Sequence, residues 1–194
     1  LCMGASPRNL GVPGEEKFIG AGVSYCATCD GGFFKGKTVA VAGGGNTAAE
    51  DALYLSKIAG KVYLIHRRDK LRATAALADS VKASGIEILW DSVIEEVAGG
   101  GKVEALKIKN VKSGEEKNLT VDGLFVAIGQ IPNTKNVGFL EKDEYGYIIT
   151  KEDMSTSIEG IFAAGDIRSK SLRQVVTACS DGAVAAESAI KYLS

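Results

Sequence analysis

Apolar runs alternate with amphipathic segments through the first half of the chain. Residues 38–42 form a short β-branched run that is typical of a strand buried on both faces of a parallel sheet. Residues 46–59 follow with helical periodicity, and residues 61–65 and 86–90 are predicted as two further strands. A second helix is predicted over residues 73–84, where a glycine ends it. This order predicts a βαβαβ unit built on a parallel sheet.

The pattern changes in the second half. Three strand-like runs lie between residues 93 and 121, separated by hairpin turns at 98–101 and 112–115, which predicts an antiparallel meander. Residues 123–129 are predicted to form another buried strand. Pro132 and Asn133 favour a sharp turn directly after it.

After this turn, the pattern predicts strands at 147–149 and 161–164 and an apolar helix from about residue 175 to residue 192. These elements are too few for a domain of their own. We therefore expect an α/β fold, in which a Rossmann-like βαβαβ domain carries an antiparallel β-meander and the C-terminal segment belongs to a second domain.

Composition narrows the possible partners and compartments. With 194 residues and 45% hydrophobic content the chain can bury a real core, and its net charge of −1 creates no field that would gather nucleic acid or an anionic membrane. No apolar run approaches the roughly 20 residues needed to span a bilayer, and no signal peptide opens the sequence. We expect a cytoplasmic protein with neither nucleic acid nor membrane as a partner. Because the chain opens on Leu1 without an initiator Met, we expect further residues upstream.

Cysteine usage points to redox chemistry rather than to a disulfide framework or a metal site. The four cysteines are too few and too unevenly spaced for a secreted disulfide scaffold. Since the chain has one His and no second ligand pair, we expect no structural zinc and no other metal. Cys2 and Cys179 lack the context of reactive thiols and are predicted to be buried and inert.

Cys26 and Cys29 form a Cys-x-x-Cys pair, whose sulfurs lie close enough to exchange between disulfide and dithiol. Asp30 follows directly and can donate protons to the thiols or accept protons from them. The two glycines after it leave the backbone accessible to another protein. A helix beginning at this pair would favour the thiolate. The alternative is a pair of ordinary core or surface cysteines.

Gly43-x-Gly45-x-x-Ala48 stands between a predicted strand and a predicted helix, the context that the dinucleotide fingerprint requires. Taken alone, such a loop is weak evidence, because a simple turn between a strand and a helix can have the same glycines. The next strand ends not in an acidic residue but in His66-Arg67-Arg68, with Arg72 one helical turn further, which suits a 2′-phosphate and favours NADP over NAD. The alternative is a solvated, basic helix start. We expect His66 to pack or to face the phosphate rather than to move protons.

Several motifs together resemble one family. They are Cys26-Ala27-Thr28-Cys29-Asp30-Gly31, Gly43-Gly44-Gly45-Asn46-Thr47-Ala48, His66-Arg67-Arg68-Asp69 with Arg72-Ala73, Gly129-Gln130-Ile131-Pro132-Asn133-Thr134, Ala163-Ala164-Gly165-Asp166 and Arg173-Gln174. In this order and over essentially the whole chain, they are similar to the low-molecular-weight thioredoxin reductases. In that family a homodimeric flavoprotein oxidoreductase passes electrons from NADPH to FAD, then to a redox-active disulfide, and finally to thioredoxin.

The resemblance implies roles for individual residues. Cys29 would be the sulfur on the flavin side, Cys26 the attacker of thioredoxin and Asp30 the acid that protonates the departing thiolate. A rotation of one domain against the other would let the dithiol and the nicotinamide reach the flavin in turn. The positions expected to bind NADPH or FAD are Gly43, Gly44, Gly45, Asn46, Thr47, Ala48, His66, Arg67, Arg68, Arg72, Ile128, Gly129, Gly165, Asp166, Arg173, Gln174 and Ala178.

The same resemblance divides the chain into three parts. Residues 1–10 would be a remnant of an FAD-binding domain, residues 11–135 the NADPH-binding domain with the redox pair, and residues 136–194 the C-terminal part of the Rossmann-like FAD-binding domain. The upstream half of that FAD domain, with its own glycine-rich loop, is expected outside this sequence. Smaller departures are Gln130, where some members carry His, and Cys179-Ser180-Asp181, where small residues are common.

Two other functions stay open on the sequence. One is a flavin reductase of another disulfide acceptor, such as a peroxiredoxin system. The other is an NADPH-binding fragment without activity of its own.

Overall fold

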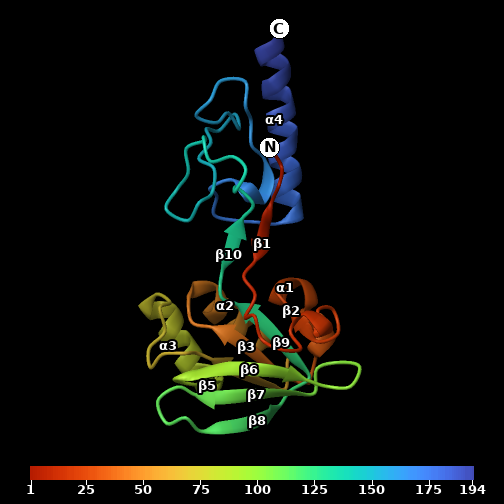
Figure 1. The fold of residues 1–194 in the computed structure, drawn as a ribbon, viewed down its shortest axis with the longest axis vertical. Coiled ribbons are helices and arrows are strands. Elements are labelled where there is room, and N and C mark those ends of the chain that lie inside the picture. The colour runs from red at the N-terminus through yellow and green to blue at the C-terminus, as the bar shows by residue number, and fades with distance from the viewer. The chain divides into compact units, whose positions relative to one another are not determined.

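The computed structural model describes residues 1–194 and divides into two compact units (Figure 1). The central unit is Arg8–Gly129, and the terminal unit combines Leu1–Pro7 with Gln130–Ser194. These divisions lie a few residues from the predicted ones, because β1 (Ala5–Pro7) pairs antiparallel with β10 (Gln130–Pro132) and both strands belong to the terminal unit.

The central unit is built on a five-stranded sheet of order β2-β9-β3-β4-β5 whose neighbours are all parallel. The sequence of elements confirms the predicted βαβαβ order. The strands are β2 (Val23–Ser24), β3 (Thr38–Gly43), β4 (Lys61–Ile65), β5 (Glu87–Leu89) and β9 (Gly123–Ala127), and the helices are α1 (Ala27–Asp30), α2 (Asn46–Leu55) and α3 (Ala75–Ala83).

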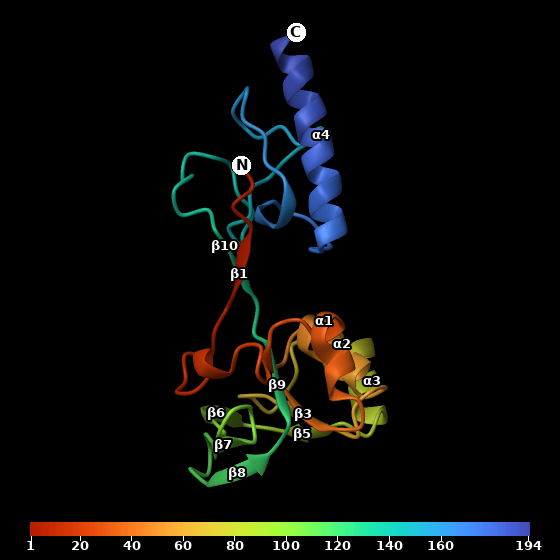
Figure 2. The same ribbon diagram turned by 90° about the vertical axis from the view of Figure 1, so that its right-hand side faces the viewer.

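A second, antiparallel sheet confirms the predicted meander. It pairs β6 (Ser92–Ala98) with β7 (Ala105–Asn110) and β7 with β8 (Glu116–Thr120). The helices α1, α2 and α3 lie on one side of the parallel sheet and the meander on the other (Figure 2). Alternate residues of β3 therefore enter different cores: Ala40 and Ala42 pack with the meander cluster, whereas Val39 and Val41 pack with the helices.

Helix ends explain the small differences from the predicted spans. The regular part of α2 ends at Leu55, and the residues up to Ala59 continue as turns that still donate to the carbonyls of Ala52 and Leu55. The helix α3 begins at Ala75 because Thr74 takes the extended N-cap conformation. Two 3₁₀ helices, η1 (Glu16–Phe18) and η2 (Gly31–Phe34), complete the central unit.

The terminal unit contains one long helix, α4 (Val175–Leu193), one 3₁₀ helix, η3 (Gly165–Ile167), and the β1–β10 pair. The strands predicted at 147–149 and 161–164 are wrong: Ile148 and Phe162 make only isolated bridges. Apolar, β-branched composition marks residues suited to a strand, but a strand also needs a ladder partner along its length. A small core of Val137, Leu140, Ile148, Ala163 and Ile167 holds these segments together.

Two further findings concern exposure. Cys2 and Cys179 are both exposed, so the prediction that they are buried is wrong. In α4 the buried residue is Asp181 alone, and large apolar side chains such as Val175, Val176 and Ile190 are exposed. None of the helices combines the length and the apolar composition that a membrane span requires.

Candidate functional site

The glycine loop between β3 and α2 is packed too closely for side chains at two positions. Gly43 has φ 154°, and a Cβ there would meet the backbone carbonyl of Ala127 and the Ala48 side chain. A Cβ on Gly44 would overlap the ring of His66. The loop therefore brings its backbone directly onto the neighbouring strand ends, as a dinucleotide-binding turn requires.

Hydrogen bonds tie this glycine loop to the basic segment that follows β4. The backbone N–H of Arg72 donates to the carbonyl of Gly44 at 2.6 Å, and the N–H of Thr74 donates to Oδ1 of Asn46 at 2.9 Å. The two loops that the sequence assigns to pyrophosphate and to 2′-phosphate are thus joined directly.

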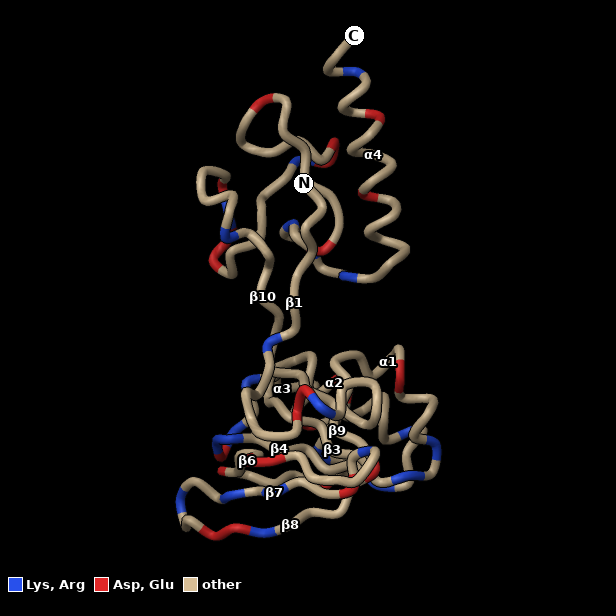
Figure 3. Tube along the Cα trace, turned by 45° about the vertical axis from the view of Figure 1, so that its right-hand side comes forward, with Lys and Arg blue, Asp and Glu red and all other residues tan.

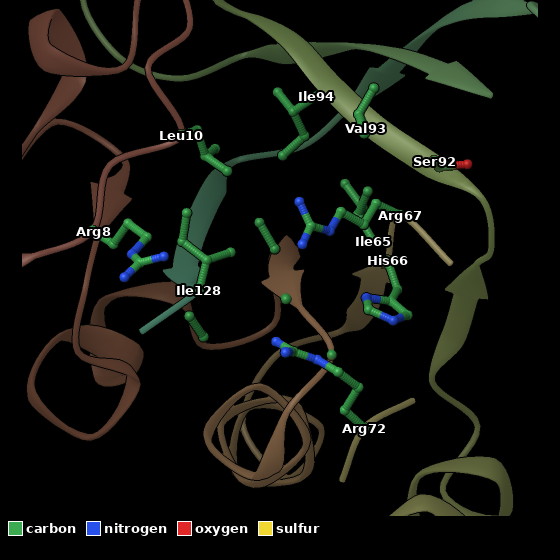
Figure 4. Close-up of a pocket in the computed structure, with 14 residues that line it drawn as sticks. Arg8, Leu10, Ile65, His66, Arg67, Arg72, Ser92, Val93, Ile94 and Ile128 are labelled. Carbon is green, nitrogen blue, oxygen red and sulfur yellow. The ribbon is translucent and has the colours of Figure 1, made fainter. Parts of the chain in front are cut away.

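A cavity of about 350 Å³ opens at the carboxyl ends of these strands, and its lining includes Gly43, Gly44, His66 and Ile128. The guanidinium groups of Arg8, Arg67 and Arg72 point into it from three sides (Figure 4). Arg68 is exposed and is not part of the lining. Arg8 is not among the site residues predicted from the sequence, and no local motif marks it.

His66 is buried, with 5% of its surface exposed, although it also contributes to the cavity lining. Its Nε2 lies 3.0 Å from the carbonyl oxygen of Lys70, and its ring meets the edge of Trp90. Burial lowers the pKa of His66, with the nearby arginines acting in the same direction. The imidazole is therefore neutral at pH 7 and separates the glycine loop from Trp90 without adding charge.

The redox pair lies in the same unit. Cys26 and Cys29 form a disulfide, with their Cα atoms 5.3 Å apart, and Cys26 is the N-cap of α1. The backbone N–H of Cys29 donates to Sγ of Cys26 at 3.2 Å, and Oγ1 of Thr28 lies 3.5 Å from the same sulfur. Hydrogen bonds to a sulfur stabilise its thiolate, so this environment favours Cys26 as the nucleophile of the reduced pair. Exposure gives the opposite order, since Cys29 is exposed and Cys26 is half-buried.

Asp30 is held in place by a buried hydroxyl. Ser24 donates to Oδ2 of Asp30 at 2.7 Å, and the same Ser24 oxygen accepts from the backbone N–H of Cys26 at 3.1 Å. Ser24 therefore links the acid to the backbone of the redox pair. It is absent from the residues predicted from the sequence, although it precedes the first cysteine by two residues and lies on the short edge strand β2.

The terminal unit gathers a second group of polar residues. Gly165 has φ 80° and begins the turn that carries Asp166, whose Oδ1 is buried without a hydrogen-bond partner. Nε of Arg173 is likewise buried and unpaired, and its guanidinium stacks 3.8 Å above the ring of Tyr147. Gln174 caps α4 through a reciprocal pair of bonds with Thr177.

Asp181 anchors this turn to α4. Its carboxylate accepts from the N–H of Gly165 at 3.0 Å and from Arg168 and Lys170 at 2.8 Å each. Burial alone would raise the pKa of Asp181, but Lys170, the Gly165 amide and Arg168 together hold it below its ordinary value. In the sequence Asp181 stands out only as a departure from the family pattern, since pairing across 16 residues leaves no local signal.

The model of the pyridine nucleotide-disulphide oxidoreductase family matches residues 1–182. The chain belongs to this family. It is 50% identical to a thioredoxin reductase of Treponema pallidum and 46% identical to one of Bacillus subtilis, covering all of this chain in both alignments. The crystal structure of thioredoxin reductase from Streptococcus pyogenes superposes with a TM-score of 0.92 at 47% identity over 99% of this chain. These relatives confirm the resemblance and the fold class inferred from sequence.

This member of the family spans just under two thirds of its relatives, namely 63% of the Treponema protein, 62% of the Bacillus protein and 64% of the Streptococcus structure. The name of the family joins a pyridine nucleotide to a disulphide, and both features have a candidate place in the central unit: the arginine-lined cavity and the Cys26–Cys29 pair. The structure gathers no group of three or more His, Cys, Asp or Glu side chains that could hold a metal ion.

The unpaired groups of the terminal unit fit a hydroxyl-rich, anionic cofactor. An orphaned carboxylate oxygen on Asp166 offers an acceptor, and an orphaned N–H on Arg173 offers a cationic donor. A buried polar atom costs free energy unless it finds a partner, so both atoms are suited to a bound ligand. A flavin nucleotide carries ribityl hydroxyls and a polar ring edge that match this donor and acceptor set.

Proposed function

We propose that this chain belongs to a flavoprotein that uses NADPH to reduce the disulfide of thioredoxin, with Cys26 and Cys29 as its redox-active centre. The observation that carries the proposal is the Cys26–Cys29 disulfide in the same compact unit as a cavity into which three guanidinium groups point. We further propose that the protein works in the cytoplasm as a homodimer. The exposed thiols of Cys2 and Cys179 suit a reducing compartment.

NADPH is the nucleotide that the cavity favours. Gly43 and Gly44 allow the backbone to approach a pyrophosphate, while Arg67 and Arg72 supply planar cationic forks for a 2′-phosphate. Arg8 faces the same space from the opposite side and adds a third cation. Since His66 is neutral, the arginines alone provide the positive charge.

FAD is the flavin that we propose for the terminal unit, held by the Gly165-Asp166 turn, Arg173, Gln174 and Ala178. Bound there, it would supply the two-electron relay between the nicotinamide and the disulfide. The chain's own contribution is to position Asp166 through Gly165 and Asp181, and to stack Arg173 on Tyr147.

Disulfide exchange then follows from the geometry of the redox pair. In the dithiol form the Cys26 thiolate attacks one sulfur of the thioredoxin disulfide, forming a mixed disulfide and releasing the other thioredoxin sulfur as a thiolate. Asp30, oriented by Ser24, delivers the proton to the departing thiolate. Cys29 next attacks Cys26, which restores the Cys26–Cys29 disulfide and frees reduced thioredoxin. Two electrons have then moved from the pair to thioredoxin.

A protein substrate also needs a contact surface beside the sulfurs. Phe33 lies on η2, directly after the redox helix, and 75% of its surface is exposed. A large exposed aromatic residue is typical of a protein interface. This position favours a protein over a small disulfide as the acceptor, and the names of the relatives favour thioredoxin among proteins.

Replacing Cys29 by Ser tests the proposal. We expect reduction of thioredoxin by NADPH to fall by at least about a thousandfold, because a serine hydroxyl cannot resolve the mixed disulfide. NADPH affinity should stay within about twofold, since Cys29 is not part of the cavity lining. The binding is read as quenching of Trp90, the one tryptophan in the chain.

Cys179→Ser is the matched control, because it removes an exposed thiol from the other unit. It should leave both turnover and NADPH binding unchanged. Turnover that persists in Cys29→Ser would contradict the assignment of the redox pair. A wild-type protein that turns over with a peroxiredoxin-type acceptor but not with thioredoxin would redirect the proposal to that acceptor.

A further inference from the structure

The basic loop after β4 carries one acidic residue. We define the arginine loop as residues 66–72, which contains Arg67, Arg68, Lys70 and Arg72 but also Asp69. An acidic residue after the second strand of a dinucleotide fold favours ribose hydroxyls and disfavours a 2′-phosphate. The Asp69 carboxylate in this loop would therefore disfavour the 2′-phosphate that the arginines would bind.

Asp69 is turned to a separate partner. Its Oδ2 lies 3.0 Å from Nζ of Lys112, and Asp69 is not among the residues that line the cavity of Arg67 and Arg72. Lys112 belongs to the hairpin turn between β7 and β8, 43 residues further along the chain. Both signs of charge are present in this meander (Figure 3), with acidic residues on β6 and basic residues on β7. The contact of Lys112 with the arginine loop therefore depends on where Lys112 lies and does not reflect a uniform charge on the meander.

Asp91 fixes Lys112 at this place. Its Oδ2 also lies 3.0 Å from Nζ of Lys112, and its side chain is only 15% exposed, compared with 73% for Asp69. The backbone of Asp91 joins the two segments as well: its N–H donates to the carbonyl of Arg68 at 3.2 Å, and its carbonyl accepts from Val111 at 2.6 Å. With φ 49°, Asp91 holds a left-handed conformation that these contacts maintain.

We propose that Lys112 is a positioning residue that determines selectivity for the 2′-phosphate, by holding and neutralising Asp69 so that Arg67 and Arg72 stay free for the ligand. This inference rests on the proposed use of NADPH. Without the ammonium group, the Asp69 carboxylate repels a dianionic phosphate and competes for the neighbouring guanidinium groups. The meander hairpin thereby takes part in choosing the nucleotide.

The test is Lys112→Gln in the full chain, with dissociation constants measured by quenching of Trp90. We expect NADPH and the fragment 2′,5′-ADP to bind about three- to fivefold more weakly, the range of an exposed ion pair. NADH and 5′-AMP, which lack the 2′-phosphate, should change by less than about twofold on the same reasoning. The difference should shrink in high salt, because the charges are exposed to solvent.

Two further variants separate this mechanism from a structural one. In Lys112→Gln combined with Asp69→Asn, NADPH affinity should return to within about twofold of wild type, since the carboxylate no longer needs neutralising. Lys109→Gln is the matched control: Lys109 lies on β7, loses the same charge and pairs with Glu95 and Glu116. It should leave the preference for NADPH unchanged.

Three results would overturn the inference. Lys112→Gln could leave the preference for NADPH unchanged, as Lys109→Gln should; it could weaken the binding of NADPH and NADH equally; or Asp69→Asn could fail to restore NADPH affinity in the double variant. Failure of the proposed function gives a different result. In that case the wild-type protein itself binds NADPH no better than NADH.

Discussion

The two units hold their candidate sites by different means. In the central unit, the glycine loop and the arginine loop follow strands of a five-stranded parallel sheet that is covered on both faces. In the terminal unit, β1 and β10 form the one ladder, and the turn at Gly165 depends on the carboxylate of Asp181. In a sheet, many backbone hydrogen bonds together fix the position of the loops, whereas in an ion network a few side chains fix it.

This difference decides where single substitutions act. A site supported by a sheet is sensitive to shape, because its backbone is already fixed and any added atom meets a packed neighbour. A site supported by a buried carboxylate is sensitive to charge, because removing one partner leaves the others buried and unpaired. The following predictions test that contrast, first in the terminal unit and then in the central one.

Asp181→Ala should have the largest effect and should act on the terminal unit alone. Arg168 and Lys170, whose side chains are 13% and 10% exposed, would lose their shared counter-ion. Breaking a buried ion pair from one side costs about 3–5 kcal/mol. Amide hydrogen exchange over residues 165–193 should rise strongly, while the unfolding midpoint read from Trp90, in the central unit, should not move.

Glu187→Ala is the control on the same helix, since Glu187 makes only an exposed pair with Lys191. Its exchange pattern should match that of the wild type. If Asp181→Ala also shifted the Trp90 midpoint, the two units would not be independent in stability.

Gly44→Ala should be the strongest test of shape in the central unit. Its Cβ would overlap the ring of His66, which is already packed between the glycine loop and Trp90. Forcing such an overlap typically costs about 1–3 kcal/mol. We expect a lower midpoint in the Trp90 unfolding curve together with weaker NADPH binding.

Gly45→Ala provides the matched control, because nothing lies within 4 Å of a Cβ at that position. Gly45 also has φ −92°, which any residue adopts. Equal shifts of the unfolding midpoint in the two variants would mean that crowding by His66 is not the cause of the lost stability.

The same contrast explains what the sequence predicts well. Residues 38–42 and 61–65 correspond to β3 and β4 within one residue, because each apolar run has a ladder partner on both sides. Residues 147–149 are likewise apolar and rich in residues that favour strands, yet Ile148 makes only single bridges. Composition reports that a segment suits a strand, and it carries no information on whether a partner lies beside it.

The sequence likewise reveals some of the candidate site residues and misses others. Gly43 and Arg67 belong to local motifs with fixed spacing, so the sequence alone marks them. Other residues contribute through contacts that no short motif marks. Arg8 lines the cavity, Ser24 donates a hydrogen bond to Asp30, and Lys112 forms an ion pair with Asp69. No local pattern encodes such pairings, and only the three-dimensional arrangement reveals them.

Asp51→Asn should give a smaller effect with a defined pH dependence. Burial, with a contribution from Glu50, raises the pKa of Asp51 on α2 from its ordinary value of 3.8 to about 6. A raised folded-state pKa means that ionisation opposes folding: the penalty is absent below pH 3.8, grows as the pH rises to about 6, and is complete above it. After allowance for partial solvent exposure, the full penalty is about 1–2 kcal/mol.

The amide that replaces the carboxylate cannot ionise, so the variant should be more stable than wild type at pH 7.5 and equal to it at pH 3.5. Urea unfolding followed by Trp90 emission at the two pH values measures this difference. Asp79→Asn, on the exposed face of α3, is the control and should show no such dependence. A gain of equal size at both pH values would mean that the amide packs better than the carboxyl group, and that the charge of Asp51 is not what opposes folding. A gain only at the higher pH would show that the central unit, although held mainly by shape, also contains a partly buried charge at Asp51 that no neighbouring cation compensates.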